Sequence, residues 1–266
     1  MTPERFQRIT ALLDKRQPDL TVCMEQVHKT HNLSAIIRTA DAVGIHNIHA
    51  IYTTESRWLS GGRASGSQKW VKVTEQPDTE TAIAQFKQQG MQVLATNLSD
   101  KAVDYRDIDY TKPTALVLGQ ERDGISDTAL ELADHHVVVP MFGMVESLNV
   151  SVAGALIMYE AQRQRIAAGM YDKPKLDAKI RHQMLFEGGH PIYAELCART
   201  QTPYPPLDED GQIMASKQWY QDLKDKYHEL PADKKSRRVD FTHTGQTFEH
   251  DPSAFRDAIG HGDKCN

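Results

Sequence analysis

Residues 143–165 read GMVESLNVSVAGALIMYEAQRQR, and this stretch decides how the main domain is built. The apolar pattern continues from residue 147 to residue 168 and predicts a long buried helix. Its start is unusual, because the short polar side chains of Ser147 and Asn149 flank a single leucine. The stretch therefore predicts the last helix of a domain.

Upstream of this helix, strand-like and helix-like patterns alternate. Short apolar runs predict strands at residues 21–27, 48–52, 71–74, 91–95, 114–118 and 136–139. Helical patterns lie between several of them, at residues 32–43, 79–89 and 127–133, the first with Asn32 as its cap. The alternation predicts an α/β fold with a largely parallel sheet. In such sheets ligands bind beyond the carboxyl ends of the strands.

Composition divides the chain into four segments. These are an N-terminal helical extension (1–19), the α/β domain (20–170), a helical C-terminal extension (171–230) and a polar tail that we expect to be mobile (231–266). The C-terminal extension carries three helical patterns, at residues 176–187, 192–200 and 216–226. The N-terminal helix is expected to start at Thr2 and Pro3, because threonine is a common cap and proline is common at the first helical position.

Bulk composition argues against several classes of protein. The net charge of −5 gives no overall basic field, so an RNA partner would need a local patch. The cysteines at positions 23, 197 and 265 form no CxxC pair, which disfavours a disulfide framework and a zinc site. No signal-like start or membrane-length apolar run is present. We expect a cytoplasmic protein that uses no metal and contacts no membrane.

Two further stretches stand out beside the opening one. HNLSAIIRTADAVG (31–44) places Arg38 on a helix rich in alanine and isoleucine, where it could be an ordinary surface ion-pair partner. LVLGQERDGIS (116–126) is a buried-looking strand that runs into Gly119 and then Glu121. It could be an ordinary strand-to-loop turn, or a backbone that approaches a ligand closely at the glycine. Glycine patterns typical of dinucleotide, P-loop and hydrolase sites are missing.

Together these stretches resemble the motifs of the SPOUT superfamily, specifically its SpoU-type ribose 2'-O-methyltransferases. The matching motifs are NLSAIIRTA (32–40), LVLGQERDGIS (116–126) and VPMFGMVESLNVSVAGALIMYE (139–160). The C-terminal stretches TPYPPLDEDGQI (202–213) and KQWYQDL (217–223) resemble the branch of the family that modifies guanosine 18 in the D-loop of tRNA. The resemblance covers roughly residues 1–228.

The resemblance implies a SPOUT fold with a C-terminal trefoil knot, and a homodimer whose catalytic centre combines residues of both protomers. It implies transfer of a methyl group from S-adenosylmethionine to the ribose 2'-hydroxyl of guanosine 18. The catalytic residues it implies are Arg38, Asn32, Glu121, Ser147 and Asn149. The cofactor-binding residues it implies are Ala95, Thr96, Leu118, Gly119, Val139, Met141, Ser147, Leu148 and Asn149.

Physical chemistry limits the role of Arg38 within that set. A ribose hydroxyl is a weak acid, so the reaction needs proton removal or stabilisation of developing alkoxide character. A guanidinium is effectively always protonated, which favours stabilisation by Arg38, oriented by a phosphate, over proton abstraction. We expect Asn32 to cap its helix and to orient Arg38 or the ribose, and Glu121 to order the loop on the substrate side.

Eight basic residues are expected to bind RNA. They are Arg5, Arg8, Lys15, Arg16, His31, Arg63, Arg163 and Arg165. Arg165 follows Asn149 by 16 residues, about 24 Å along a straight helix, so we expect it to reach RNA or the partner protomer and not its own cofactor site. For Arg163, a favourable interaction with the helix C-terminus is an equal alternative. For the N-terminal set, a merely solvated charged face is the alternative.

Two other functions stay open at this point. One keeps the chemistry and changes the substrate, as in a ribosomal RNA ribose methyltransferase of the same superfamily. The other is an RNA-binding protein that keeps the fold without activity. A comparison of methyl transfer to tRNA and to ribosomal RNA distinguishes the first alternative from the tRNA enzyme. A cofactor titration that shows no binding would favour the second.

Overall fold

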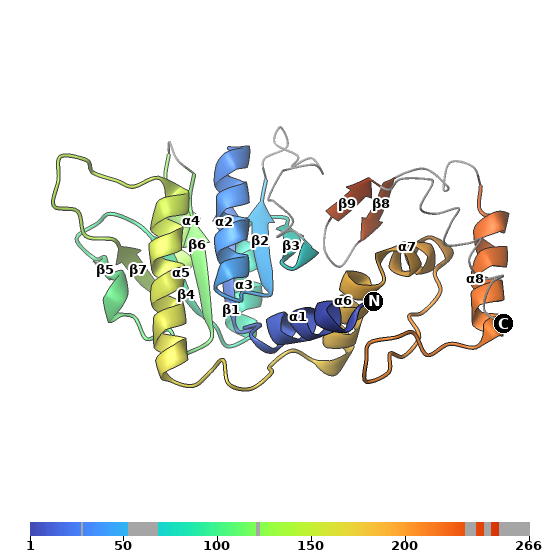
Figure 1. The fold of residues 1–266 in the computed structure, drawn as a ribbon. Helices are drawn as coiled ribbons and strands as arrows, with labels where there is room; N and C mark the ends of the chain where they lie inside the picture. The colour runs from blue at the N-terminus through green and yellow to red at the C-terminus, as the bar shows by residue number, and fades with distance from the viewer. Residues whose placement is uncertain (28, 53–68, 121–122, 232–237, 242–245, 250–266) are drawn as a thin grey trace. The chain divides into compact units, whose positions relative to one another are not determined.

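The structure is a computed structural model that describes residues 1–266 with the exception of 28, 53–68, 121–122, 232–237, 242–245 and 250–266 (Figure 1). The chain forms two compact units. The first, which we call the α/β unit, is Lys15–Lys175, and the second, the helical unit, combines Met1–Asp14 with Leu176–Asn266.

The α/β unit contains one parallel sheet with the strand order β3-β2-β1-β6-β4-β7-β5. Its strands are β1 (Leu20–Glu25), β2 (Asn47–Ile51), β3 (Lys72–Gln76), β4 (Gln92–Thr96), β5 (Val103–Asp104), β6 (Thr114–Leu118) and β7 (His135–Val138). The six strands expected from the sequence are confirmed to within two residues. The two-residue strand β5 was not predicted, because it is too short to show an alternating pattern.

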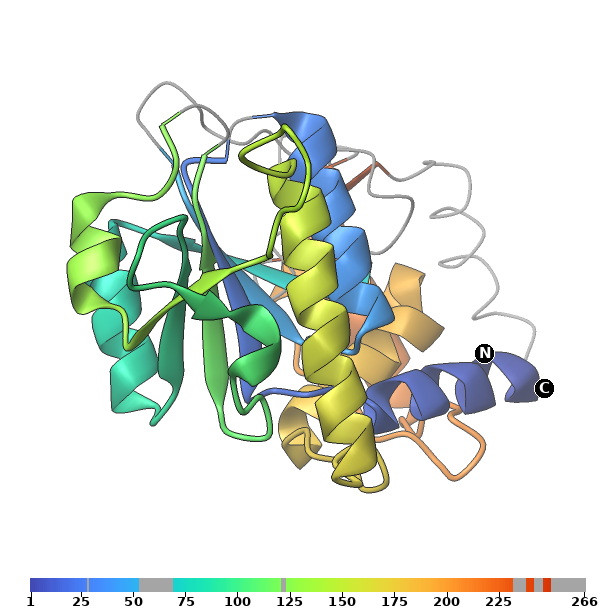
Figure 2. The ribbon, with the colours of Figure 1, turned by 90° about the vertical axis from the view of Figure 1, so that its left-hand side faces the viewer.

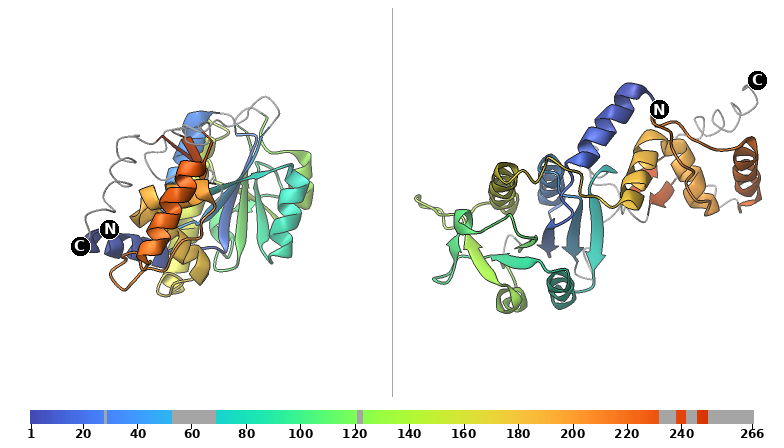
Figure 3. Two further views of the ribbon diagram at one scale, coloured as in Figure 1. Left: turned by 90° about the vertical axis from the view of Figure 1, so that its right-hand side faces the viewer. Right: turned by 90° about the horizontal axis from the view of Figure 1, so that it is seen from below.

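Helices cover both faces of the sheet, with α2 (Thr30–Ala42) and α5 (Val150–Ala167) on one face and α3 (Thr79–Gln88) and α4 (Asp127–Leu132) on the other (Figures 2 and 3). A short 3-10 helix, η2 (Tyr105–Asp107), follows β5. Strands buried on both faces read as continuous apolar runs and not as alternating ones. This explains the unbroken apolar sequence of β6.

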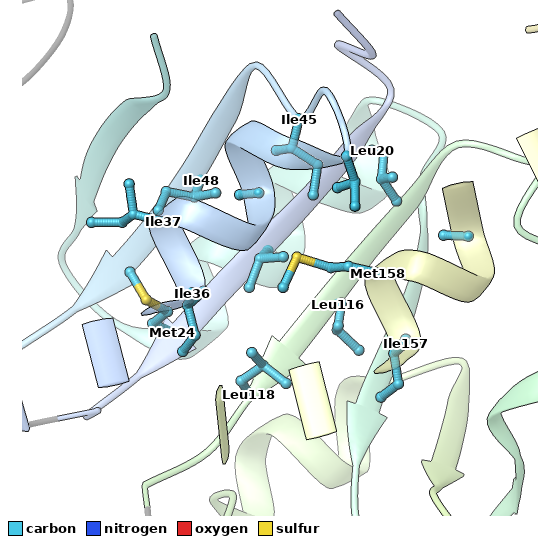
Figure 4. Close-up of a cluster of buried hydrophobic side chains, with 14 of the residues drawn as sticks. Leu20, Met24, Ile36, Ile37, Ile45, Ile48, Leu116, Leu118, Ile157 and Met158 are labelled. Atoms are coloured by element: carbon cyan, nitrogen blue, oxygen red, sulfur yellow. The ribbon is translucent and has the colours of Figure 1, made fainter. Parts of the chain in front are cut away.

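The core lies in two layers, one on each side of the sheet. Leu116 and Leu118 of β6 pack with Ile36 of α2 and Ile157 of α5 (Figure 4). Their neighbours in the same strand point the other way and join the second layer with Phe86 of α3. The period of two along β6 therefore fixes α2 and α5 to one face, which positions the start of α5 beside the carboxyl ends of the strands.

The strand order places three loops at one edge of the sheet. β1 lies between β2 and β6, so the chain crosses from one side of β1 to the other after β3. The segments that follow β4, β6 and β7 leave the carboxyl ends of three neighbouring strands. A crevice at such a reversal is where open α/β sheets bind their ligands.

Two helix starts differ from the sequence prediction. α5 begins at Val150 with Asn149 as its cap, so Ser147 and Leu148 precede the helix and do not belong to it. α2 begins at Thr30, which places Asn32 inside the first turn and not at the cap. The predicted cap was wrong because the Asn32 side chain is buried, 1% exposed, and accepts a hydrogen bond from Asn149.

The helical unit contains α1 (Pro3–Asp14), α6 (Ala178–Gly189), α7 (Pro191–Thr200) and α8 (Lys217–Glu229). The hydroxyl of Thr2 accepts a hydrogen bond from the backbone N–H of Arg5, and the helix begins at Pro3, as expected. Arg5 also donates to the Gly188 carbonyl, which ties α1 to α6. In the tail, β8 (Arg238–Phe241) and β9 (Gln246–Glu249) pair as antiparallel strands.

Among the described residues, no helix combines the length and the apolar composition of a membrane span. Within the described ranges, no cluster of three or more His, Cys, Asp or Glu side chains is arranged to hold a metal ion.

Candidate functional site

A cavity of about 470 Å³ opens at the carboxyl edge of the sheet. Its lining comes from residues 96–98 after β4, residues 118–120 and 124–125 after β6, residues 137–139, 141 and 146–150 around β7, and from Lys29, Ala153 and Ile157. All of these residues belong to the α/β unit. A concave site of this size suits a drug-sized or cofactor-sized molecule.

Most of the expected cofactor-binding residues lie at this cavity. Eight of them line it: Thr96, Leu118, Gly119, Val139, Met141, Ser147, Leu148 and Asn149. Ala95, which is fully buried within β4 next to Thr96, is not among the lining residues. The sheet thus gathers residues from three distant segments of the sequence onto one surface.

Gly119 fits the first of its two alternative interpretations, a strand-to-loop turn, and it also lines the cavity. A Cβ at this position would lie 2.3 Å from the carbonyl oxygen of Gly124. The same carbonyl accepts a hydrogen bond of 2.9 Å from the N–H of Gln120. The loop after β6 therefore closes tightly on itself, and this closure alone requires glycine at 119.

Asn149 connects the starts of the two helices on this face of the sheet. Its Nδ2 donates to Oδ1 of Asn32 at 3.2 Å, while its own Oδ1 accepts from the N–H and hydroxyl of Ser151 at 2.9 and 2.6 Å. A side chain bonded on both sides keeps one rotamer. Asn32 therefore acts on the cavity through Asn149, which lines it.

The remaining expected catalytic residues are less closely gathered. Ser147 is exposed in the loop before α5 and lines the cavity. Arg38 is exposed on α2, is not part of the lining, and makes no hydrogen bond or ion pair with another described residue. Glu121 and the expected RNA contact Arg63 lie outside the described residues.

Two of the expected RNA-binding residues are buried. Arg165 is 0% exposed and Arg16 is 1% exposed. Arg165 forms an ion pair of 2.6 Å with Asp19, and Arg16 forms one with Asp41. A buried guanidinium that is bonded internally does not reach a phosphate in solvent, so the RNA-binding prediction for these two residues is corrected to a structural role. Their position in the sequence gave no sign of this.

The other described basic residues of that set lie on the surface. Arg5, Arg8, Lys15, His31 and Arg163 are exposed. Lys15 donates to the Tyr171 carbonyl at 2.8 Å, and Arg163 pairs with Glu160 at 2.7 Å. Exposed side chains in such weak local contacts are free to exchange them for phosphate.

Sequence reasoning missed the charged residues of the cavity. Within the described lining, Lys29 and Glu146 are the charged side chains. Glu146 lies inside the third motif and Lys29 just before the first, but the sequence alone assigned neither of them a role. Cys23 lies nearby on β1, but burial, and then the charge of Glu25, raise the pKa of its thiol far above the ordinary value. The thiol stays neutral and is a poor nucleophile.

The outer face of α5 carries four exposed apolar side chains. Val152, Leu156, Tyr159 and Ile166 are 47%, 40%, 52% and 58% exposed, and their spacing puts them on one side of the helix. The preceding loop adds Phe142, Met144 and Val145, which are 98%, 100% and 60% exposed. We call these seven residues the α5 face. Exposed apolar side chains gathered in this way, here with the exposed Arg163 between Tyr159 and Ile166, are typical of an interaction site.

Comparison with known proteins finds two matching families, which cover the α/β unit from residue 19 onward and part of the C-terminal extension. The family described as "SpoU rRNA Methylase family" matches residues 19–159, and the one described as "SpoU, rRNA methylase, C-terminal" matches residues 163–216. The tRNA (guanosine(18)-2'-O)-methyltransferase of Escherichia coli (strain K12) is 53% identical over 222 residues, which are 83% of this chain and 97% of that protein.

Two solved structures of SpoU-type enzymes are similar to this chain in fold and in sequence. The A. aeolicus TrmH/SpoU tRNA modifying enzyme has a TM-score of 0.66 and 41% identity, covering 71% of this chain and 96% of its own. The SpoU methyltransferase AviRb from Streptomyces viridochromogenes, in complex with the cofactor AdoMet, has a TM-score of 0.50 and 30% identity, covering 57% and 62%. From its motifs, its parallel sheet and these matches, the chain belongs to the SpoU methylase family.

Proposed function

We propose that this protein methylates the ribose 2'-hydroxyl of guanosine 18 in the D-loop of tRNA, with S-adenosylmethionine as the methyl donor. The observation that carries the proposal is a cavity lined by residues of the second and third sequence motifs, one of which, Asn149, is hydrogen-bonded to Asn32 of the first. The E. coli relative named for this reaction supports it, since 97% of that protein aligns with the chain.

The cavity fits S-adenosylmethionine in size and in chemistry. Its volume of about 470 Å³ is typical of cofactor sites. The apolar side chains of Leu118, Val139 and Leu148 offer a slot for the adenine ring, while Glu146 and Lys29 match the charges of the amino-acid end. When bound, the cofactor supplies a methyl group on a positively charged sulfur. AviRb, a family member, was solved with this cofactor.

Arg38 is the residue that we propose acts on the ribose hydroxyl. Its side chain is exposed and unpaired by described residues, so it is available to stabilise negative charge on the oxygen as the proton leaves. Asn32, held by Asn149, fixes the start of the same helix. Because Arg38 does not line the cavity of its own chain, we propose that Arg38 of one protomer completes the cavity of its partner.

If Arg38 acts in the cavity of its partner, two copies must form a homodimer, and we propose that they do so through the α5 face. Val152, Leu156 and Tyr159 leave a helix of the domain core half exposed, and a second copy would remove that apolar surface from water. The face starts directly after Asn149, the cap of α5 at the cavity. A two-fold contact there would bring each cavity next to the partner's helices.

We also propose the trefoil knot that the resemblance implies. In the family the knot is formed in the C-terminal part of the domain and binds the cofactor. In this chain the loop after β6 and the loop before α5 both border the cavity. These two loops are the segments that such a knot would bring together.

The exposed basic residues are proposed to hold the tRNA. Arg5 and Arg8 lie on α1, whereas Lys15, His31 and Arg163 lie in the α/β unit. Contacts between such residues and phosphates release counterions, so the affinity for tRNA is expected to fall as the salt concentration rises. A tRNA substrate places the proposed activity in the cytoplasm.

The proposed function is tested by transfer of radiolabelled methyl from S-adenosylmethionine to unmodified tRNA transcripts, followed by nuclease mapping of the product. We expect one 2'-O-methylguanosine, in the D-loop. A transcript with guanosine 18 replaced by adenosine is the matched control and should take up no label at that position.

Ribosomal RNA is the second candidate substrate, because the matching family is described by ribosomal RNA methylation. Label on ribosomal RNA but not on tRNA would keep the chemistry and replace the substrate. Absence of cofactor binding would instead favour the non-catalytic RNA-binding alternative.

Replacing Leu156 with glutamate is expected to dissociate the proposed dimer, because two charged side chains would be buried at its centre. Sedimentation equilibrium should change from a dimer to a monomer for Leu156→Glu. Ile180→Glu, a change at a residue 38% exposed on α6 of the helical unit, is the control and should leave the dimer intact. An unchanged dimer in Leu156→Glu would contradict the α5 face as the interface.

A further inference from the structure

Glu25, the last residue of β1, is a buried carboxylate that the proposed reaction does not use. It is 2% exposed. One oxygen, Oε1, accepts from the hydroxyls of Thr79 and Ser126, and the other, Oε2, accepts from the backbone N–H of Ser126 at 2.8 Å. Burying a charge is costly unless it is hydrogen-bonded, so three donors at one carboxylate indicate a site built for an anion.

The backbone holds Glu25 firmly in place. It pairs with Ile51 across the sheet. The next residue, Gln26, takes a left-handed conformation (φ 53°) and donates its N–H to the Ile51 carbonyl at 3.0 Å. The carboxylate is therefore carried by the end of an inner strand of the sheet and not by a loop.

Ser126 is the residue that Glu25 holds in place through two hydrogen bonds. Its hydroxyl donates to Glu25 at 2.6 Å and accepts from the N–H of Ala129 at 3.1 Å, which caps α4. Its backbone N–H is held by the same carboxylate. Glu25 thus fixes the point where the loop after β6 ends and α4 begins, although the two residues lie 101 positions apart in the sequence.

The loop that ends at Ser126 is one wall of the cavity. Gly119, Gln120, Gly124 and Ile125 line it. The close approach of Gly119 to Gly124, and the hydrogen bond of 2.9 Å from Gln120 to Gly124, hold the two ends of the loop against each other. Ser126 directly follows Gly124 and Ile125, which line the cavity.

We propose that Glu25 is a positioning residue for the cofactor site, which sets the place of the loop after β6 through Ser126. This role rests on the proposed function, in that the cavity is taken to bind S-adenosylmethionine. The carboxylate accepts all its bonds and donates none, whereas an amide of the same shape loses the charge and presents N–H groups to donors. Charge-assisted bonds are roughly twice as strong as neutral ones, so the loop would loosen.

The test is isothermal titration of S-adenosylmethionine into the wild-type protein and three variants. Glu25→Gln is expected to weaken the affinity by about tenfold, which corresponds to about 1.4 kcal/mol. Thr79→Val is the matched control: it removes a donor from the same carboxylate, but on the α3 side. It should change the affinity less than about twofold. Ser126→Ala, which removes the hydroxyl bond and the α4 cap, should weaken the affinity and shows the effect even if Glu25→Gln does not fold.

Thermal unfolding of each variant separates positioning from general loss of stability. An equal loss of affinity in Glu25→Gln and Thr79→Val, or wild-type affinity in both Glu25→Gln and Ser126→Ala, would overturn the role of Glu25. If the wild-type protein itself binds no S-adenosylmethionine, the proposed function fails first. The wild-type titration therefore distinguishes the two failures.

Discussion

Replacing Arg165 with alanine is expected to lower the free energy of unfolding by about 3–5 kcal/mol, as is typical when one partner of a buried ion pair is removed. The side chain is 0% exposed and uses all of its donors. Nε donates to the Tyr110 carbonyl at 2.9 Å, Nη1 to Gln17 and Asp19 at 3.2 and 2.6 Å, and Nη2 to the Asp19 and Lys112 carbonyls at 3.1 and 3.0 Å. Alanine would leave these acceptors and the Asp19 charge without their main partner.

The bonds of Arg165 hold three segments of the α/β unit together. Arg165 joins the last turn of α5 to the segments just before β1 and β6. The measurement is urea denaturation followed by circular dichroism. Arg163→Ala, two residues earlier on the same helix, is the matched control, because Arg163 is exposed and its ion pair is with its neighbour Glu160. It should change the stability by less than about 0.5 kcal/mol. Similar denaturation midpoints for the two variants would refute the structural role of Arg165.

The same network predicts how stability depends on pH. Burial alone would raise the pKa of Asp19, but the charges and hydrogen bonds of Arg165, together with Lys175, hold that pKa below its ordinary value. A carboxylate with a lowered pKa in the folded state contributes stability above its unfolded pKa of about 3.9. The contribution is lost as the pH falls through the folded value. Wild type should therefore lose stability below about pH 4 more steeply than Arg165→Ala.

Arg38→Ala is expected to abolish most methyl transfer while leaving cofactor binding unchanged. Loss of one group that stabilises developing negative charge costs about 100-fold to 1,000-fold in rate. Arg38 is not part of the cavity lining, so the affinity for S-adenosylmethionine should stay within about twofold of wild type. Single-turnover methylation of tRNA transcripts and cofactor titration measure the two quantities separately.

Arg106→Ala is the control for this experiment. Arg106 is an exposed arginine of the same unit that pairs with its neighbour Asp104, and its loss should leave the rate unchanged. An equal loss of cofactor affinity and rate in Arg38→Ala would show that Arg38 shapes the cavity. That result would remove the role proposed for it.

Most of the α/β unit could be predicted from the sequence because its signals are local. The unbroken apolar run of β6 reflects burial on both faces, and its position was predicted correctly. The motif residues around Gly119 and Ser147 were also gathered as expected, since they follow the carboxyl ends of neighbouring strands.

The predictions that were wrong concerned residues whose hydrogen-bond or ion-pair partners lie far away in the sequence. Asn32 has the residue type and position of a helix cap, but its buried side chain bonds Asn149, 117 positions away. Arg165 looks like a surface cation at a helix end, yet Asp19 and two carbonyls enclose it. A single charged residue carries no periodicity, so nothing in its neighbourhood distinguishes an exposed arginine from a buried one.

The sequence by itself therefore determined where most strands and helices lie along the chain, which family motifs are present, and at which edge of the sheet the site forms. Hydrophobic period and turn chemistry act over a few residues and can be read directly. Only the tertiary structure decided which polar residues face the cavity and which are buried as supports, such as Glu25 and Arg165. The physical reason is that a buried charge is tolerated only where distant donors or acceptors surround it, and that environment exists only in the folded chain.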